Sequence, residues 1–172
     1  MNEITKSFEL ISIKNNHLKT RYEENVFATN DTHVITYENT APIHPDLFNS
    51  MQRLTTHVAA ITGMMIFDDN IRVGGFQRQN IGDAQLVTIY AYIILSAANR
   101  KKAEDTEPKT TGNMAVRLYI GRDEYPDIDL LLEDLSQCER EANLYISQGK
   151  SFAQEKSIKL DNEDMNLLNP AA

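Results

Sequence analysis

Cysteine and tryptophan are nearly absent from this chain of 172 residues, which has one cysteine and no tryptophan. A single thiol, Cys138, cannot form an intrachain disulfide, so we expect a reducing, cytoplasmic setting. No apolar run approaches the roughly 20 residues that a membrane-spanning helix needs. The first ten residues also lack the basic-then-apolar layout of a signal peptide. These absences exclude a disulfide scaffold and argue against a membrane partner.

The short motifs that carry common chemistries are missing as well. The sequence has neither GxxxxGK[ST] nor GxGxxG for phosphates, no HExxH for zinc and no GxSxG for a serine nucleophile. Its four histidines have no Cys, Asp or Glu at a metal-ligand spacing, which favours structural or solvated roles. We therefore predict a protein that is not an enzyme and holds no metal or cofactor. An active site assembled from dispersed residues would leave no motif, and that alternative stays open.

What is present fits one ordinary domain. Hydrophobic residues make up 41% of the chain and charged residues 24%, which is typical of a globular protein. We expect a single domain over residues 1–150 and a polar tail or arm over 151–172. Strand-like runs cover 8–14, 17–25, 32–39, 64–79, 84–100 and 113–121. Asn15-Asn16 suits a tight hairpin between the first two, because Asn tolerates a positive φ.

Two helices are predicted, and the same short motif precedes both. "IHPDLF" at 43–48 and "EYPDID" at 124–129 each place Pro-Asp before an apolar pattern of helical period. Gly63 and Gly149 follow the two patterns as expected C-caps. The sequence thus predicts an α+β fold with a mixed or antiparallel sheet of about six strands. The order of the predicted elements suggests a βββα pseudo-repeat, although two independently evolved helix caps explain the repeated Pro-Asp motif equally well.

The formal charge of −8 is unevenly distributed. Residues 70–122 carry eight bases and four acids, whereas the segments on either side are acidic. A local basic surface in an acidic chain can hold a phosphate-bearing ligand. The same bases can also simply solvate strand edges and a loop. The candidate ligand-binding residues are Arg72, Arg78, Arg100, Lys101 and Arg117.

Three features refine this expectation. Gly74-Gly75 interrupts a strand, which indicates a bulge or the close approach of another group, and Arg78 follows beside two glutamines. Arg100 and Lys101 lie at the mouth of a charged loop, where they either bind a ligand or end an apolar strand. The strand around Leu86–Leu95 is apolar on both faces, so we expect a central strand covered on both sides.

The segments "HPDLFNSMQRLTTHVAAITG" and "EYPDIDLLLEDLSQCEREANLYISQGKSFAQ" resemble a family of small, uncharacterised phage and prophage proteins. These share an HPDL-type helix entrance and a late acidic helix that ends in an aromatic residue and a GK-xxAQ segment. The matching residues are His44–Leu47, Tyr145, Gly149, Lys150, Ala153 and Gln154. The resemblance implies a virus-encoded accessory protein of the bacterial cytoplasm, of a kind that commonly binds nucleic acid, host factors or nucleotide signals used in defence.

Two functional hypotheses follow. In the first, a non-enzymatic phage protein binds a small anionic, nucleotide-like ligand or a host defence component, with an anti-defence role. In the alternative, the protein binds single-stranded nucleic acid through three arginines and four aromatic residues: Arg72, Arg78, Arg117, Phe76, Tyr90, Tyr92 and Tyr119. The net charge of −8 counts against this alternative.

We also expect self-association. Two amphipathic helices cover only part of a sheet with so many apolar residues, which leaves apolar surface at Ile89, Ile93 and Leu95, together with Leu167-Leu168 of the tail, to contact a second subunit. The expected assembly is a homodimer or higher homo-oligomer with the ligand site near the subunit boundary.

Overall fold

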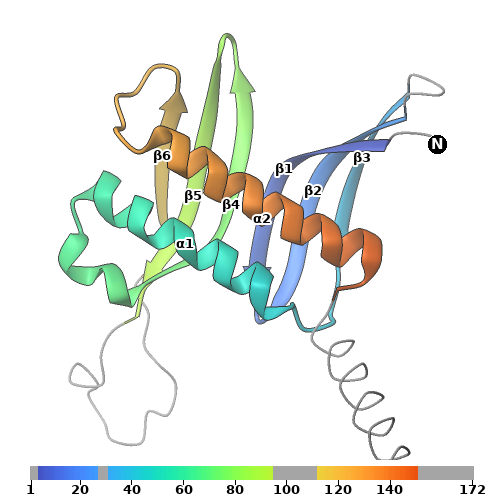
Figure 1. Ribbon diagram of the computed structural model, residues 1–172, viewed down its shortest axis with the longest axis horizontal. Coiled ribbons are helices and arrows are strands. Elements are labelled where there is room, and N and C mark those ends of the chain that lie inside the picture. The colour runs from blue at the N-terminus through green and yellow to red at the C-terminus, as the bar shows by residue number, and fades with distance from the viewer. Residues whose placement is uncertain (1–3, 27–30, 95–111, 151–172) are drawn as a thin grey trace, which may run out of the picture.

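The computed structural model describes residues 4–26, 31–94 and 112–150 (Figure 1). Within these ranges the predicted α+β fold is confirmed, with six strands and two long helices. The elements are β1 (Ile4–Lys14), β2 (His17–Val26), β3 (Asp31–Glu38), α1 (Pro45–Thr62), the short 3-10 helix η1 (Met65–Asn70), β4 (Ile71–Ile81), β5 (Ala84–Ile93), β6 (Met114–Ile120) and α2 (Ile128–Gln148). All neighbouring strands are antiparallel, in the order β3-β2-β1-β4-β5-β6.

Both helices pack on the same face of the sheet, where they lie side by side (Figure 1). The apolar residues that recur with the helical period form one stripe on each helix, and these stripes are fully buried. They consist of Leu47, Met51, Leu54 and Val58 of α1, and Leu131, Leu135, Cys138 and Ala142 of α2. The sheet meets them with buried side chains that include Ile11, Leu18, Phe76 and Ile89. Burying each large apolar side chain contributes about 1.5–3 kcal/mol, so this single layer of contacts is the main source of stability.

The helix ends follow the local sequence signals. The ring nitrogen Nδ1 of His44 accepts a hydrogen bond of 3.1 Å from the Asp46 N–H and so caps α1. Gly63 and Gly149 adopt left-handed conformations, with φ of 70° and 65°, and end the two helices as predicted. The first hairpin also turns as predicted, with φ of 52° at Asn15 and 62° at Asn16.

The predicted βββα repeat is present in the order of the elements. Each half consists of a hairpin, a third strand and a helix, and β1 of the first half pairs with β4 of the second. The two central strands carry bulges at corresponding places, between Phe8 and Leu10 in β1 and between Val73 and Gly75 in β4. The sheet is therefore two similar units joined through a short central ladder.

One expectation about β5 holds and one is wrong. β5 lies between β4 and β6, as expected of a central strand, with buried residues on both faces, although both described helices lie on the same face. Ile89 does not supply surplus surface, because its side chain is 1% exposed beneath the helices. Leu95, Arg100, Lys101 and the expected tail over 151–172 fall outside the described residues. None of the described helices is long and apolar enough to cross a membrane.

Candidate functional site

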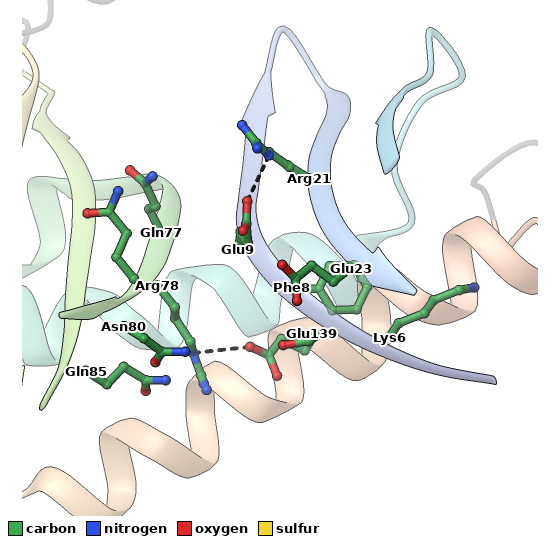
Figure 2. A pocket seen from close by; sticks show the side chains of 12 residues that line it. Lys6, Phe8, Glu9, Arg21, Glu23, Gln77, Arg78, Asn80, Gln85 and Glu139 are labelled. Carbon is green, nitrogen blue, oxygen red and sulfur yellow. Dashed lines mark ion pairs between the residues drawn. The ribbon is translucent and has the colours of Figure 1, made fainter. Parts of the chain in front are cut away.

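A cleft opens where the two halves of the sheet separate. β1 and β4 share only three residue pairs, Leu10 with Gln77, Ile11 with Phe76, and Ser12 with Gly75. Beyond the first of these pairs the strands diverge, and a pocket of about 610 Å³ lies between them (Figure 2). Its lining is polar apart from Phe8: Lys6, Ser7, Glu9, Arg21 and Glu23 come from β1 and β2, Gln77–Asn80 from β4, Gln85 from β5 and Glu139 from α2.

Gly75 explains why the strands touch where they do. A Cβ atom at this position would lie 2.5 Å from the carbonyl oxygen of Ile11 and 2.8 Å from the Cα of Ser12, so only glycine allows the two backbones to come this close. The neighbouring Gly74 lies at the bulge, and the nearest atom to its Cβ would be 3.8 Å away. The sequence predicted a bulge or a close approach at this pair, and both are confirmed.

The opposite end of the central ladder is closed by a side chain from α1. The Gln52 Nε2 donates to the Val73 carbonyl oxygen at 2.9 Å, and the Gln52 Oε1 accepts from the Val73 N–H at 3.3 Å. The buried residues of the two helices have the same spacing, so α1 can be aligned with α2 by placing Leu47 on Leu131. In this alignment Ser136 of α2 corresponds to Gln52 of α1. Its hydroxyl donates to Leu132 of its own helix, so α2 provides no such bridge and the cleft stays open.

Arg78 forms the floor of the cleft. It follows Phe76 on the helix-facing side of β4 and points toward α2, where its Nε lies 3.2 Å from Oε1 of Glu139 (Figure 2). This contact pairs the charges without the alignment of a hydrogen bond. Among the described residues, neither Nε nor Nη2 of Arg78 has a hydrogen-bond partner, although both atoms are buried. Buried N–H groups without an acceptor are costly, and a ligand oxygen would relieve that cost.

Both other basic residues of the cleft are already engaged. Arg21 pairs with Glu9 at 2.8 Å, and the Lys6 ammonium donates to Ser147 of α2 at 2.7 Å. Burial raises the pKa of the Glu139 carboxyl, while the positive charge of Arg78 opposes that rise. With three basic and three acidic residues in the lining, the cleft has no net formal charge. Among the described residues of the cleft, Arg78 is thus the one basic side chain with buried N–H groups that have no hydrogen-bond acceptor.

The structure separates the arginines that the sequence grouped together. Arg78 lies in the cleft, whereas Arg72 and Arg117 lie on the opposite, helix-free face of the sheet, and Arg100 and Lys101 are outside the described residues. The sequence reasoning missed the partners that α2 and β1 contribute. One signal was available: Arg78 and Asn80 continue the inward-facing alternation of Phe76, where polar residues are unexpected.

A buried polar cluster joins the two helices beside the core. The ring of His57 contacts the Tyr125 hydroxyl at 2.7 Å through Nδ1 and the Asp134 carboxylate at 3.1 Å through Nε2. Arg53 lies 2.9 Å from the other oxygen of Asp134. His57 is 2% exposed and Asp134 4%, so this cluster is closed to a substrate and acts as a link between α1 and α2.

Other reactive groups in the described residues give no catalytic arrangement. Cys138 is fully buried, and burial raises the pKa of its thiol to about 12, so the thiol stays protonated at neutral pH. In the parts of the chain that the structure covers, no three or more His, Cys, Asp or Glu side chains gather as metal ligands would.

Comparison of the chain with protein-family models, with curated proteins and with solved structures found no match.

Proposed function

We propose that this protein binds a small, nucleotide-like ligand in the cleft between β1 and β4 and does not transform it. The observation that carries the proposal is Arg78, whose buried Nε and Nη2 atoms have no hydrogen-bond acceptor among the described residues. A guanidinium presents N–H groups in a fixed fork that matches the oxygens of a phosphate. An anionic group of the ligand at this position would supply the acceptors that the folded chain does not.

The rest of the lining suits the neutral part of such a ligand. Gln77, Gln79, Asn80 and Gln85 bring four carboxamides to the cleft, and each offers both donors and an acceptor. Nucleobases and riboses carry the complementary groups. The volume of about 610 Å³ lies within the range of pockets for small molecules. A polar lining without net charge favours a ligand with one anionic centre and several neutral polar groups over a polyanion.

A cellular role follows from the resemblance to phage proteins. A virus-encoded protein that holds a nucleotide signal of host defence lowers the free concentration of that signal by mass action. This activity needs a tight pocket and no catalytic group. It places the protein in the cytoplasm of the infected bacterium, where we propose an anti-defence function.

Calorimetric titration with cyclic mononucleotides, cyclic dinucleotides and linear mononucleotides tests the proposal, beside mass spectrometry for a copurified ligand. We expect Arg78→Gln to weaken binding of the preferred compound by roughly 10- to 100-fold, the usual worth of hydrogen bonds to a charged group. Arg72→Gln is the matched control, because it removes an arginine from the other face and should leave the affinity unchanged. Silence across the panel together with an empty pocket in mass spectrometry would overturn the proposal.

A further inference from the structure

The helix-free face of β4, β5 and β6 gathers aromatic and basic side chains. Residues paired across antiparallel strands point to the same face. Val73 with Ala91 and Ile89 with Val116 face the helices. The alternate pairs must therefore face away from them. The resulting surface, which we call the tyrosine face, consists of Arg72, Tyr90, Tyr92, Arg117 and Tyr119.

The side chains of the tyrosine face are available and ordered. The three tyrosines are half-buried, and Arg117 is exposed. The Tyr90 hydroxyl donates to Gln77 Oε1 at 2.9 Å, which fixes one ring against the sheet. Nη1 of Arg72 donates to the carbonyl oxygens of Asp69 and Ile71, which holds that guanidinium at the start of β4.

The charge of this face differs from that of the whole chain. No acidic residue lies within the strands β4, β5 and β6, which contribute Arg72 and Arg117 to the tyrosine face. On the same side of the other half, in β1, β2 and β3, Glu9 and Glu38 are paired with Arg21 and Lys19, so these charges largely cancel. A polyanion is therefore attracted to the half of the sheet that carries the tyrosine face.

We infer that the tyrosine face is a binding surface for single-stranded nucleic acid, separate from the cleft and beyond the function proposed for it. Unpaired bases stack on aromatic rings whatever their sequence, and arginines contact the phosphates between them. A duplex keeps its base faces inside the stack and so offers nothing to the tyrosines. Tyr90 and Tyr92 are two positions apart on one strand, so their Cα atoms lie about 6.5–7 Å from each other on the same face of the sheet.

This surface is smaller than the one the sequence suggested. Phe76 is fully buried in the core, and the Arg78 side chain points to the helix-facing side of the sheet, toward Glu139 of α2. Neither can contact a strand that lies on the tyrosine face. With two arginines, binding should be weak and should depend on salt with a log–log slope of about −1.4.

Fluorescence anisotropy with a labelled oligothymidylate at low salt tests the inference. We expect Tyr119→Leu to weaken binding by roughly 5- to 100-fold, while Tyr119→Phe, which keeps the ring, binds as the unaltered chain does. Arg117→Gln should reduce the salt slope to about −0.7, whereas Arg140→Gln, which removes an exposed arginine from α2, should not change it. Arg78→Gln should also leave binding unchanged, which separates this surface from the cleft.

Three results would overturn the inference. The first is that the protein does not bind the oligothymidylate at low salt. The second is that Tyr119→Leu and Tyr119→Phe lose affinity for it equally. The third is a change in molecular mass of the Tyr119→Leu protein by light scattering, because the tyrosine face would then be a contact between copies of the chain.

Discussion

Glu139 is the natural competitor of any anion that approaches Arg78. Its Oε1 lies 3.2 Å from the Arg78 Nε, so an ionised Glu139 both neutralises the guanidinium and repels a phosphate. Burial raises the pKa of the Glu139 carboxyl, which brings its protonation closer to neutral pH than for an exposed glutamate. The charge of the cleft floor is therefore adjustable.

The proposed ligand should bind more tightly as the pH falls. Below the raised pKa of Glu139 the carboxyl is neutral and Arg78 is released to the ligand, whereas above it the carboxylate competes. Glu139→Gln should mimic the protonated state, with higher affinity at neutral pH and a flatter pH profile. Calorimetry of both proteins across pH checks this, since titration of the ligand itself affects the two equally. A steeper profile in the variant would contradict the role given to Glu139.

Gly75 is the residue on which the contact between the two halves of the sheet depends. Gly75→Ala should destabilise the protein by about 1–3 kcal/mol or more, because the added Cβ meets main-chain atoms that cannot move independently. The neighbouring Gly74→Ala serves as control, since the nearest atom to its Cβ would be 3.8 Å away. Urea unfolding of both variants measures the difference. Equal stability of the two would show that β1 and β4 can separate without cost.

Local features were predictable at the residue scale, and the cleft was not. The caps at Gly63 and Gly149 and the turn at Asn15-Asn16 depend on neighbours within a few positions, so the sequence contains the whole signal. The pairing of Arg78 with Glu139 joins a strand to a helix far along the chain. Nothing in the spacing of either residue shows which partner the fold will bring.

At the scale of elements, the two βββα units are alike in order and differ in how each helix meets the central strands. The capped edge at Val73 and the open cleft beside Phe8 occupy corresponding places in the two halves. The difference arises from one position, which is Gln52 in α1 and Ser136 in α2. A long carboxamide bridges to a strand edge, whereas a short hydroxyl returns to its own helix. The sequence predicted the repeat but not this difference, because the alignment of the helices appears only in three dimensions.

Gln52 should therefore contribute to stability through β4. Gln52→Leu leaves the Val73 N–H and carbonyl without the partners they have now, and we expect a loss of about 1–3 kcal/mol. Gln137→Leu is the matched control, because among the described residues the Gln137 side chain bonds to Arg140 and Glu141 of its own helix and to no strand. This control should change the free energy of unfolding by no more than about 0.5 kcal/mol, as most surface substitutions do. Thermal and urea unfolding compare the two, and a larger loss in the control would refute the bridge.

At the scale of the whole molecule, the sequence predicted the class of fold and the number of strands and helices. It did not show which face of β5 the helices cover, since a strand that is apolar on both parities looks the same whether helices cover one face or two. Leu86 and Thr88 are 7% and 6% exposed on the face of β5 that the described helices do not cover. Their burial on this face therefore does not come from the two described helices.

The expected homo-oligomer cannot form through Ile89, because this residue is buried in the core. A different surface remains. In the part of the chain that the structure describes, β6 has a strand neighbour on one side only, and Arg117 is its single charged residue. Exposed edges with few charges pair readily with another strand. We therefore predict that two copies join through their β6 edges about a twofold axis.

Light scattering at micromolar concentration should then give at least twice the chain mass of 19.5 kDa. Tyr119→Leu should keep this mass, because its side chain points away from the sheet and not along the edge. The cleft lies inside one sheet, between β1 and β4, so Arg78→Gln should also keep the mass while it loses the ligand. A single species of 19.5 kDa at high concentration would rule out the dimer and leave the cleft as a site of the monomer.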